Sequence, residues 1–315
     1  QAVKAVIPPA NDWEFSVEID PTMVDRAKID ALASEGMNRA SIGIQDFDPL
    51  VQGAIGRIQP YDITKACVDD LRAAGINSLN ADLVYGLPHQ DLVRIDDTVS
   101  RVLELAPDRV ALFGYAHVPW VSKRQKLIDD TALPRDLDRY HLAEQAAARF
   151  RAAGFDAIGI DHFALHDDGL ARAAREGRLR RNFQGYTDDT CPTLIGMGAS
   201  SISRLPGGYV QNAAATAAYV QRIEAGELAG ARGHLMTQDD LLRARAIEML
   251  MCEFRLDRNE LQASFGPLAS TLDSTLALLA ERFGDLVALD DDALEIRPEG
   301  RALTRIVASA TQSGL

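Results

Sequence analysis

Apolar and polar positions in the first half of the chain form a repeating pattern of short strands and longer helices. Short apolar runs of strand length cover residues 15–20, 39–44, 78–84, 109–115 and 157–160. Helical spacing is expected over residues 21–36, through Cys67 to 75, and over 92–105 and 137–153. Three of these helices end at a glycine (Gly36, Gly75 and Gly154) that a short link and a strand follow. This repeat predicts an α/β fold of stacked βα units around a parallel sheet.

A complete or partial (β/α) barrel is predicted in preference to an open doubly wound sheet, because no glycine-rich phosphate fingerprint follows any strand. The pattern changes after about residue 205. Helices are expected from Thr237 to Phe254, near Glu260 and over 268–283, and a last one begins near Pro298. Residues 286–289 and 293–296 are expected to form a hairpin. We therefore predict a partial barrel over 1–205 and a mainly helical domain, with a small winged-helix-like hairpin, over 206–315.

Composition and charge narrow the function classes. The 315 residues have 47% hydrophobic content, 25% charged residues and a formal net charge of −13. Nucleic acid and anionic membranes favour a basic face, so neither is an expected partner. The tip of the predicted wing, Asp290-Asp291-Asp292, would repel phosphate. No apolar run is long enough for a bilayer and no signal segment is visible, which predicts a cytoplasmic protein.

Polar residues lie toward the carboxyl end of each of the five predicted strands. They are Glu18, then Gln45 and Asp46, then Asp82, then Tyr115 and His117, then Asp161 and His162. One polar strand end is commonly a helix cap, but chemistry in barrels gathers at the carboxyl ends of the strands. Five such ends in succession predict one polar cavity.

Seven strings resemble the radical-SAM, oxygen-independent coproporphyrinogen III oxidase (dehydrogenase) family. They are residues 18–21 (EIDP), 41–47 (SIGIQDF), 82–88 (DLVYGLP), 115–119 (YAHVP), 161–164 (DHFA), 181–187 (RNFQGYT) and 196–203 (GMGASSIS). The first three are shared with relatives that include the heme chaperone branch. The strings at 161–164 and 181–187 are typical of the oxidase itself.

The resemblance implies S-adenosylmethionine and a [4Fe-4S] cluster as cofactors in heme (porphyrin) biosynthesis. A radical formed from S-adenosylmethionine would abstract hydrogen from two propionates of coproporphyrinogen III. Each would then lose carbon dioxide and an electron to leave a vinyl group, giving protoporphyrinogen IX. An electron donor of unknown identity is also implied. The positions that match cofactor contacts in the family are Glu18, Gln45, Arg57, Asp82, Ala116 and Ile202. Glu18 and Asp82 would accept hydrogen bonds, and Arg57 suits a carboxylate.

Candidate substrate contacts are Tyr115, His117, Asp161, His162, Arg178 and Arg181. Arginines suit propionates, although Arg178 and Arg181 could also form a solvated helix end. His162 could equally be a structural histidine, and the glycines of the string at 196–203 could be purely conformational. Gly114 departs from the asparagine expected in the family, which puts a side-chain contact there in doubt.

The three cysteines, Cys67, Cys191 and Cys252, are far apart in sequence and lack cluster spacing. The family's CxxxCxxC loop and a Gly-Gly-Gly-Thr-Pro turn would precede Gln1. We therefore expect no metal site in this chain, and we expect the chain alone to be inactive, with catalysis by the full-length protein. Three alternatives remain open: a heme-binding chaperone of the same superfamily, a cluster-less binding paralogue, and a barrel lyase unrelated to radical chemistry.

Overall fold

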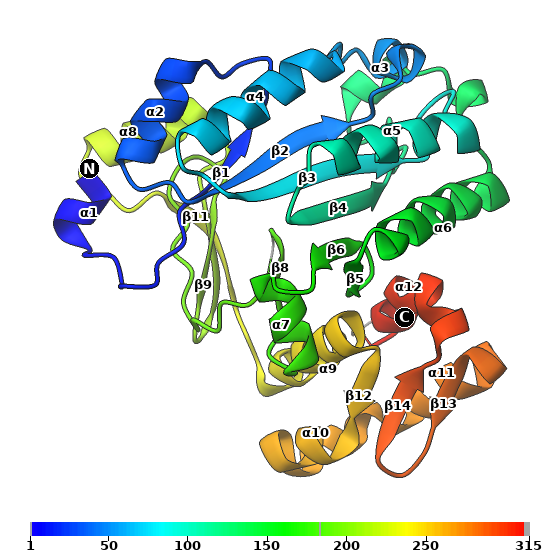
Figure 1. Cartoon of the computed structure of the whole chain (residues 1–315). Helices are drawn as coiled ribbons and strands as arrows, with labels where there is room; N and C mark the ends of the chain where they lie inside the picture. Colours follow the sequence, from blue (N-terminus) through cyan, green and yellow to red (C-terminus); the bar gives the residue numbers. More distant parts are fainter. Residues whose placement is uncertain (1, 183, 312–315) are drawn as a thin grey trace. The chain divides into compact units, whose positions relative to one another are not determined.

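The computed structural model describes residues 2–182 and 184–311, so Phe183 of the string at 181–187 lies outside the described residues. The chain forms two compact units, residues 1–172 and 173–315 (Figure 1). This division, between residues 172 and 173, separates two regions that each pack mainly within themselves. The functional boundary expected near residue 205 stays a prediction. No helix among the described residues is long and apolar enough to cross a membrane.

The first unit is built on a six-stranded sheet in the order β1-β2-β3-β4-β6-β5. Its strands are β1 (Ser16–Ile19), β2 (Arg39–Gln45), β3 (Ser78–Tyr85), β4 (Arg109–Gly114), β5 (Phe155–Ile158) and β6 (His162–Leu165). Its helices are α1 (Ala2–Val6), α2 (Arg26–Ser34), α3 (Pro49–Ile55), α4 (Tyr61–Ala73), α5 (Leu92–Glu104) and α6 (Asp136–Ala152), with short turns η1 (Lys123–Leu127) and η2 (Asp130–Ala132). Strands β1 to β4 are parallel, as the βα repeat predicts.

The two faces of the sheet differ in polarity because side chains alternate along each strand. On β2 and β3, Ile42, Ile44, Leu79 and Leu83 are buried in one core with residues of α2, α4, α5 and α6. Figure 1 shows α4 and α5 lying along the same side of the sheet. Alternate residues point to the other face, where Ser41, Gly43, Asn80 and Asp82 are polar or glycine and Val84 is the apolar exception. The face of the sheet that packs against the helices is therefore apolar. The opposite face, which we call the inner face, is mainly polar on β2 and β3.

The predicted start of the first helix is wrong by one turn or more. Asp20 and Pro21 form a turn, in which the Thr22 amide and hydroxyl both donate to Asp20 Oδ1, at 2.9 and 2.7 Å. Helix α2 begins after Asp25, whose carboxylate accepts a hydrogen bond from the Lys28 amide. Two aspartates with N-cap chemistry lie close together here, and the one nearer the strand caps a turn instead.

The last strand predicted in the barrel also differs from the prediction, because it pairs antiparallel and not parallel. The run at 157–160 becomes β5, which forms a tight antiparallel hairpin with β6, and β6 pairs antiparallel with β4. The strand next to β4 is therefore β6, a strand that the apolar pattern did not predict. Asp161 and His162 lie in and just after the turn of this hairpin. They do not follow a parallel strand.

Helix α7 (Gly169–Arg175) spans the division between the units, and the second unit contains three small sheets. Strands β7 (Arg180–Asn182) and β8 (Gly185–Thr187) form a hairpin, and β9 (Ile202–Leu205), β10 (Gly208–Asn212) and β11 (Gly230–Leu235) form a meander. The third sheet joins β12 (Arg255–Asp257), β14 (Ala293–Ile296) and β13 (Val287–Leu289). The helices are α8 (Thr216–Glu224), α9 (Gln238–Glu253), α10 (Arg258–Phe265), α11 (Asp273–Phe283) and α12 (Thr304–Ser309), with turns η3 (Gly266–Leu272), η4 (Gly284–Leu286) and η5 (Pro298–Leu303). The predicted cap at Thr237 is confirmed, with Asp240 completing a capping box.

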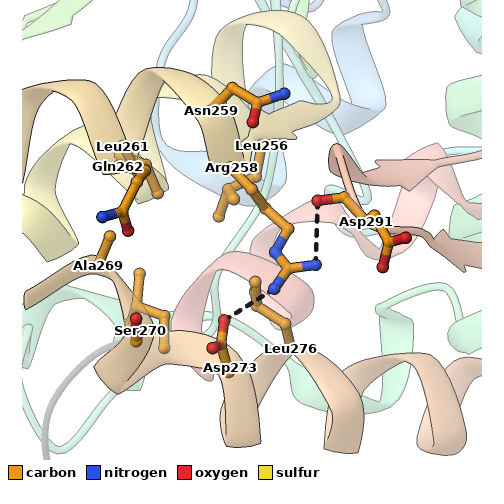
Figure 2. Close-up of a pocket in the computed structure, with 11 residues that line it drawn as sticks. Leu256, Arg258, Asn259, Leu261, Gln262, Ala269, Ser270, Asp273, Leu276 and Asp291 are labelled. Carbon is orange, nitrogen blue, oxygen red and sulfur yellow. Dashed lines mark hydrogen bonds and ion pairs between the residues drawn. The ribbon is translucent and has the colours of Figure 1, made fainter. Parts of the chain in front are cut away.

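The predicted winged hairpin is present as β13 and β14, and its tip is tied down by Arg258. The Arg258 guanidinium donates to the carbonyl oxygens of Asp290 and Asp291 at 2.9 and 3.2 Å and to Asp273 at 3.1 Å. Arg258 lines a pocket of about 170 Å³, and Figure 2 shows it between the hairpin tip and α11. Nη1 and Nη2 of Arg258 both donate to other groups of the second unit, so Arg258 serves to fix the hairpin.

Candidate cofactor site

Four polar residues on the inner face of β1, β2 and β3 form one hydrogen-bonded group, which we call the acidic cluster (Glu18, Ser41, Asn80 and Asp82). Asp82 accepts hydrogen bonds from the Ser41 hydroxyl at 2.9 Å and from the Asn80 amide at 2.8 Å. Asn80 also donates to Ser41 Oγ at 3.0 Å. Glu18 lies directly opposite Ser41 in the strand register. Parallel pairing thus places two predicted cofactor residues, Glu18 and Asp82, on one side of the sheet.

The electrostatics of the acidic cluster favour a positively charged or proton-donating ligand. Burial raises the pKa of Asp82, although its hydrogen bonds with Ser41 and Asn80 and the charge of His162 oppose the shift. Desolvation also raises the pKa of Glu18, and the Asp82 charge adds to that increase. A cation or a set of hydroxyl donors bound between them would relieve the repulsion between the two carboxylates.

Gln45 and Arg57 meet at Gly43, which is paired with Asp82 in the β2–β3 register. Arg57 Nη2 and Gln59 Nε2 donate to the Gly43 carbonyl at 3.0 and 3.1 Å. A Cβ on Gly43 would lie 3.2 Å from Gln45 Nε2 and 3.1 Å from Arg57 Nη2, so the absence of a side chain makes room for both. Arg57 also forms an ion pair with Asp20 at 3.3 Å. The carboxylate partner expected for Arg57 is therefore supplied in part by the chain itself.

The segment after β4 presents Tyr115, Ala116 and His117 at the same end of the sheet. The Tyr115 hydroxyl lies 3.2 Å from His117 Nδ1. The carbonyl oxygens of Tyr115 and Ala116 accept hydrogen bonds from Arg139 at 2.7 Å and from Gln125 at 3.0 Å. These bonds fix the backbone of the segment. The rings of Tyr115 and His117 remain partly exposed.

His162 lies near the acidic cluster, on the far side of β4 from Asp82. It pairs with Ala111, which in turn pairs with Asp82, so β4 alone separates the two residues across the sheet. His162 Nδ1 lies 2.7 Å from Asp161 Oδ1, and its ring meets Phe113 edge to face at 5.7 Å. The hairpin thus places His162 one strand away from Asp82 through antiparallel pairing, while the cavity expected around them stays a prediction.

The remaining predicted residues belong to the second unit. Ile202 begins β9, and its backbone would lie only 2.8 Å from a Cβ on Gly196, so Gly196 is required by close packing. Arg178 is exposed and paired with Glu176, as expected of a solvated residue. Arg181 is half-buried, with its guanidinium 5.5 Å from the Tyr186 ring centroid. The contribution of Ile202, Arg178 and Arg181 to the site stays a prediction.

The thiols in the described residues do not fit an iron–sulfur cluster. Cys67 is on α4, Cys252 is on α9 and Cys191 is an exposed residue after β8. Burial raises the pKa of Cys67 to about 11 and that of Cys252 to about 12, which disfavours the thiolate form that binds iron. Among residues 2–182 and 184–311, no group of three metal-ligating side chains comes together.

The acidic cluster contains two residues that the sequence interpretation missed, Ser41 and Asn80. Asn80 lies two positions before Asp82 on β3, and Ser41 lies opposite Glu18 in the β1–β2 register. Each alternates with buried apolar neighbours, Ser41 with Ala40 and Ile42, and Asn80 with Leu79 and Ala81. This period of two was the available signal, since it shows which side chains share the polar face.

Comparison with known proteins places this geometry in a family. The family model of the Radical SAM superfamily matches residues 2–102. An oxygen-independent coproporphyrinogen III oxidase of Cereibacter sphaeroides is 61% identical over 309 residues, which cover 98% of this chain and 68% of that protein. The chain belongs to the oxygen-independent coproporphyrinogen III oxidase family. A relative in Salmonella typhimurium is 39% identical over 93% of this chain and 65% of its own length.

The fold agrees with this membership. The coproporphyrinogen III oxidase of Escherichia coli, described as a radical SAM enzyme, has a TM-score of 0.91 and 36% identity, covering 96% of this chain and 70% of that structure. The resemblance to the oxidase family and the fold class are therefore confirmed. The family implies S-adenosylmethionine and a [4Fe-4S] cluster. The carboxylates and amides of the acidic cluster fit the former, and the described cysteines do not fit the latter.

Gly114, the departure from the family pattern, has a structural counterpart. A Cβ at position 114 would lie 2.8 Å from the Tyr85 hydroxyl. An asparagine in this place would require the Tyr85 ring to move. In this member of the oxidase family, Tyr85 occupies the space beside the end of β4.

Proposed function

We propose that this chain is the S-adenosylmethionine- and porphyrinogen-binding part of an oxygen-independent coproporphyrinogen III oxidase. Joined to a cluster-binding segment, it would convert coproporphyrinogen III to protoporphyrinogen IX in heme biosynthesis. The observation that carries the proposal is the acidic cluster, which lies on one face of β1, β2 and β3 in a chain 61% identical to such an oxidase over 98% of its length. Gln45 and Tyr115 lie at the carboxyl ends of β2 and β4, the end of the sheet at which enzymes of barrel architecture bind their ligands.

When bound, S-adenosylmethionine together with a reduced [4Fe-4S] cluster would supply the hydrogen-abstracting radical. The role we assign to Glu18 and Asp82 is to accept hydrogen bonds from the cofactor's ammonium group and hydroxyls. Gln45 and Arg57, which meet at Gly43, would contact its polar groups from β2. Ala116 would contribute its backbone, since its side chain is only a methyl group, and Ile202 would add an apolar contact.

The substrate carries four propionates, and we propose that it is held by the polar residues around the cofactor. His162 is supported by its place one strand away from Asp82, and Asp161 by its contact with His162. Tyr115 and His117 are supported by their mutual contact just after the end of β4. Of the two arginines, Arg181 is the better supported, because Arg178 is exposed and already paired with Glu176. A half-buried guanidinium binds a carboxylate more strongly than a solvated one.

We also propose that the protein acts in the cytoplasm, without nucleic acid or membrane partners, and receives electrons from a separate donor. The net charge of −13 supports the absence of nucleic acid partners. An acidic surface overall also disfavours binding to anionic lipids.

The proposal is tested by anaerobic turnover of coproporphyrinogen III, with this chain joined to a cluster-binding segment and supplied with iron, sulfide, a reductant and S-adenosylmethionine. The expected result is carbon dioxide release with protoporphyrinogen IX formation, lost in Asp82→Asn and retained in Arg178→Ala. Tight heme binding without decarboxylation would instead favour the heme-binding chaperone. Absence of both activities would favour the cluster-less binding paralogue.

A further inference from the structure

Asp46 is a fully buried carboxylate that lies directly after Gln45 and has no role in the site described above. It accepts hydrogen bonds from the Asp48 amide and the Gln90 side-chain amide, both at 2.6 Å, and from the Thr98 hydroxyl at 3.0 Å. No cation pairs with it among the residues that the structure describes. Burying a charge that only neutral donors satisfy costs free energy of folding. Packing alone does not explain why a carboxylate occupies this position.

The first thing that Asp46 holds is the backbone of Gln45. Gln45 has a φ of 69°, a left-handed value that is uncommon for a residue other than glycine. The Asp46 amide donates to the Ile44 carbonyl at 3.0 Å, so Ile44, Gln45 and Asp46 form a strained γ-turn. The turn directs the Gln45 side chain back toward Gly43, beside Arg57. Strain of this kind persists only where the surrounding structure enforces it.

The second thing that Asp46 holds is the end of β3, through Gln90. Gln90 Oε1 accepts hydrogen bonds from the Gly86 amide at 2.6 Å and the Leu87 amide at 3.3 Å. Its amide nitrogen donates to the Val84 carbonyl at 3.0 Å as well as to Asp46. The carboxyl ends of β2 and β3 are therefore joined behind the site by one buried side-chain pair.

Thr98 on α5 completes the group. Its hydroxyl donates to Asp46 and accepts a hydrogen bond from the Phe47 amide at 3.1 Å. Asp46, Gln90 and Thr98 are all buried, and we call them the buried polar triad. The triad connects the two strands that carry Gln45 and Asp82 to a helix anchored in the core.

We propose that the buried polar triad is a positioning device, which holds Gln45 and the end of β3 in the arrangement that binds S-adenosylmethionine. The inference rests on the proposed function, because it concerns the same cofactor site. None of the three side chains needs to touch the cofactor. Their effect is exerted through the γ-turn at Gln45 and through the backbone from Val84 to Leu87. A triad that serves only folding would influence stability and leave cofactor affinity unchanged.

The test is isothermal titration of S-adenosylmethionine into the full chain and three variants, with urea unfolding measured in parallel. Thr98→Val removes the hydroxyl but keeps the shape, and should weaken binding at least tenfold. Thr98→Ser keeps the hydroxyl and should bind within twofold of wild type. Val99→Ala, at the adjacent fully buried position on α5, is the matched control: it lowers stability without touching the triad and should leave affinity unchanged.

Asp46→Asn provides an independent second variant, and should weaken binding to a similar degree if it folds. Equal affinity in wild type, Thr98→Val and Thr98→Ser would overturn the positioning role while leaving the cofactor site intact. Loss of affinity in Val99→Ala equal to that in Thr98→Val would also overturn it, because general destabilisation would then explain both. A wild-type chain that does not bind S-adenosylmethionine would refute the cofactor site and the positioning role together.

Discussion

The hairpin that brings His162 to the site depends on one aromatic residue of α6, Phe150. Its side chain is fully buried and packs against Phe155 of β5 and Phe163 of β6, with ring centroids 5.8 and 5.3 Å apart. Because β6 replaces a parallel strand beside β4, this packing determines where Asp161 and His162 lie. Phe150→Ala should therefore destabilise the first unit and displace the hairpin.

The expected loss can be worked from these contacts. Truncating a buried phenylalanine to alanine typically costs about 3–5 kcal/mol, from lost transfer free energy and the cavity left behind. The two ring pairs account for about 1–3 kcal/mol of this, at about 0.5–1.5 kcal/mol each. Phe150→Leu keeps most of the apolar volume and loses only the ring pairs, so it should cost about 1–3 kcal/mol.

Urea unfolding followed by tryptophan fluorescence measures these losses in the first unit alone. The chain has two tryptophans, Trp13 and Trp120, both in that unit. Trp120 is 78% exposed, so Trp120→Phe is a neutral background in which Trp13 is the sole reporter. A loss below about 1 kcal/mol for Phe150→Ala would refute the anchoring role, since a filled core position cannot be emptied at so small a cost.

Three further predictions concern charge, the hairpin tip and close packing. Burial raises the pKa of the Asp82 carboxyl in the folded protein above its ordinary value of 3.8. The wild-type protein therefore becomes less stable as pH rises from that ordinary value through the raised pKa of the folded state. Asp82→Asn should therefore be the more stable protein near pH 7, with the difference shrinking near pH 4, as urea titrations would register. Arg258→Ala should cost the second unit about 1–2 kcal/mol by thermal unfolding, because two carbonyl bonds and a half-exposed ion pair are lost. Gly196→Ala should alter the circular dichroism and protease resistance of the second unit, since its Cβ would collide with the Ile202 backbone.

Much of the first unit follows from the sequence because its rules are local. Glycine-terminated helices and apolar strands identify β1 to β4 to within one or two residues. The β5–β6 hairpin does not follow from the sequence in this way. Its strands have four residues each, and the predicted apolar run overlaps only one of them. Which strand pairs with β4 depends on the tertiary packing of Phe155 and Phe163 against α6, a long-range choice that local pattern does not encode.

The candidate site was predictable to a similar extent. Polar strand ends indicated Glu18, Gln45, Asp82 and His162. Parallel pairing was enough to bring Glu18 and Asp82 to one face, whereas the place of Gln45 depends on the turn at the end of β2. The contacts of Arg57 were not predictable, since they depend on a glycine at position 43 that leaves room for its guanidinium. The buried polar triad was also hidden, because Gln90 and Thr98 belong to a loop and a helix whose distance from Asp46 only the fold determines.

The central claim, that the acidic cluster binds S-adenosylmethionine, is tested most directly by equilibrium binding to wild type, Glu18→Gln and Asp82→Asn at neutral pH. Wild type should bind, and each variant should bind at least about tenfold more weakly, a difference of about 1.4 kcal/mol. Unchanged affinity in both variants would contradict the claim, because the two carboxylates would then contribute nothing to the cofactor site.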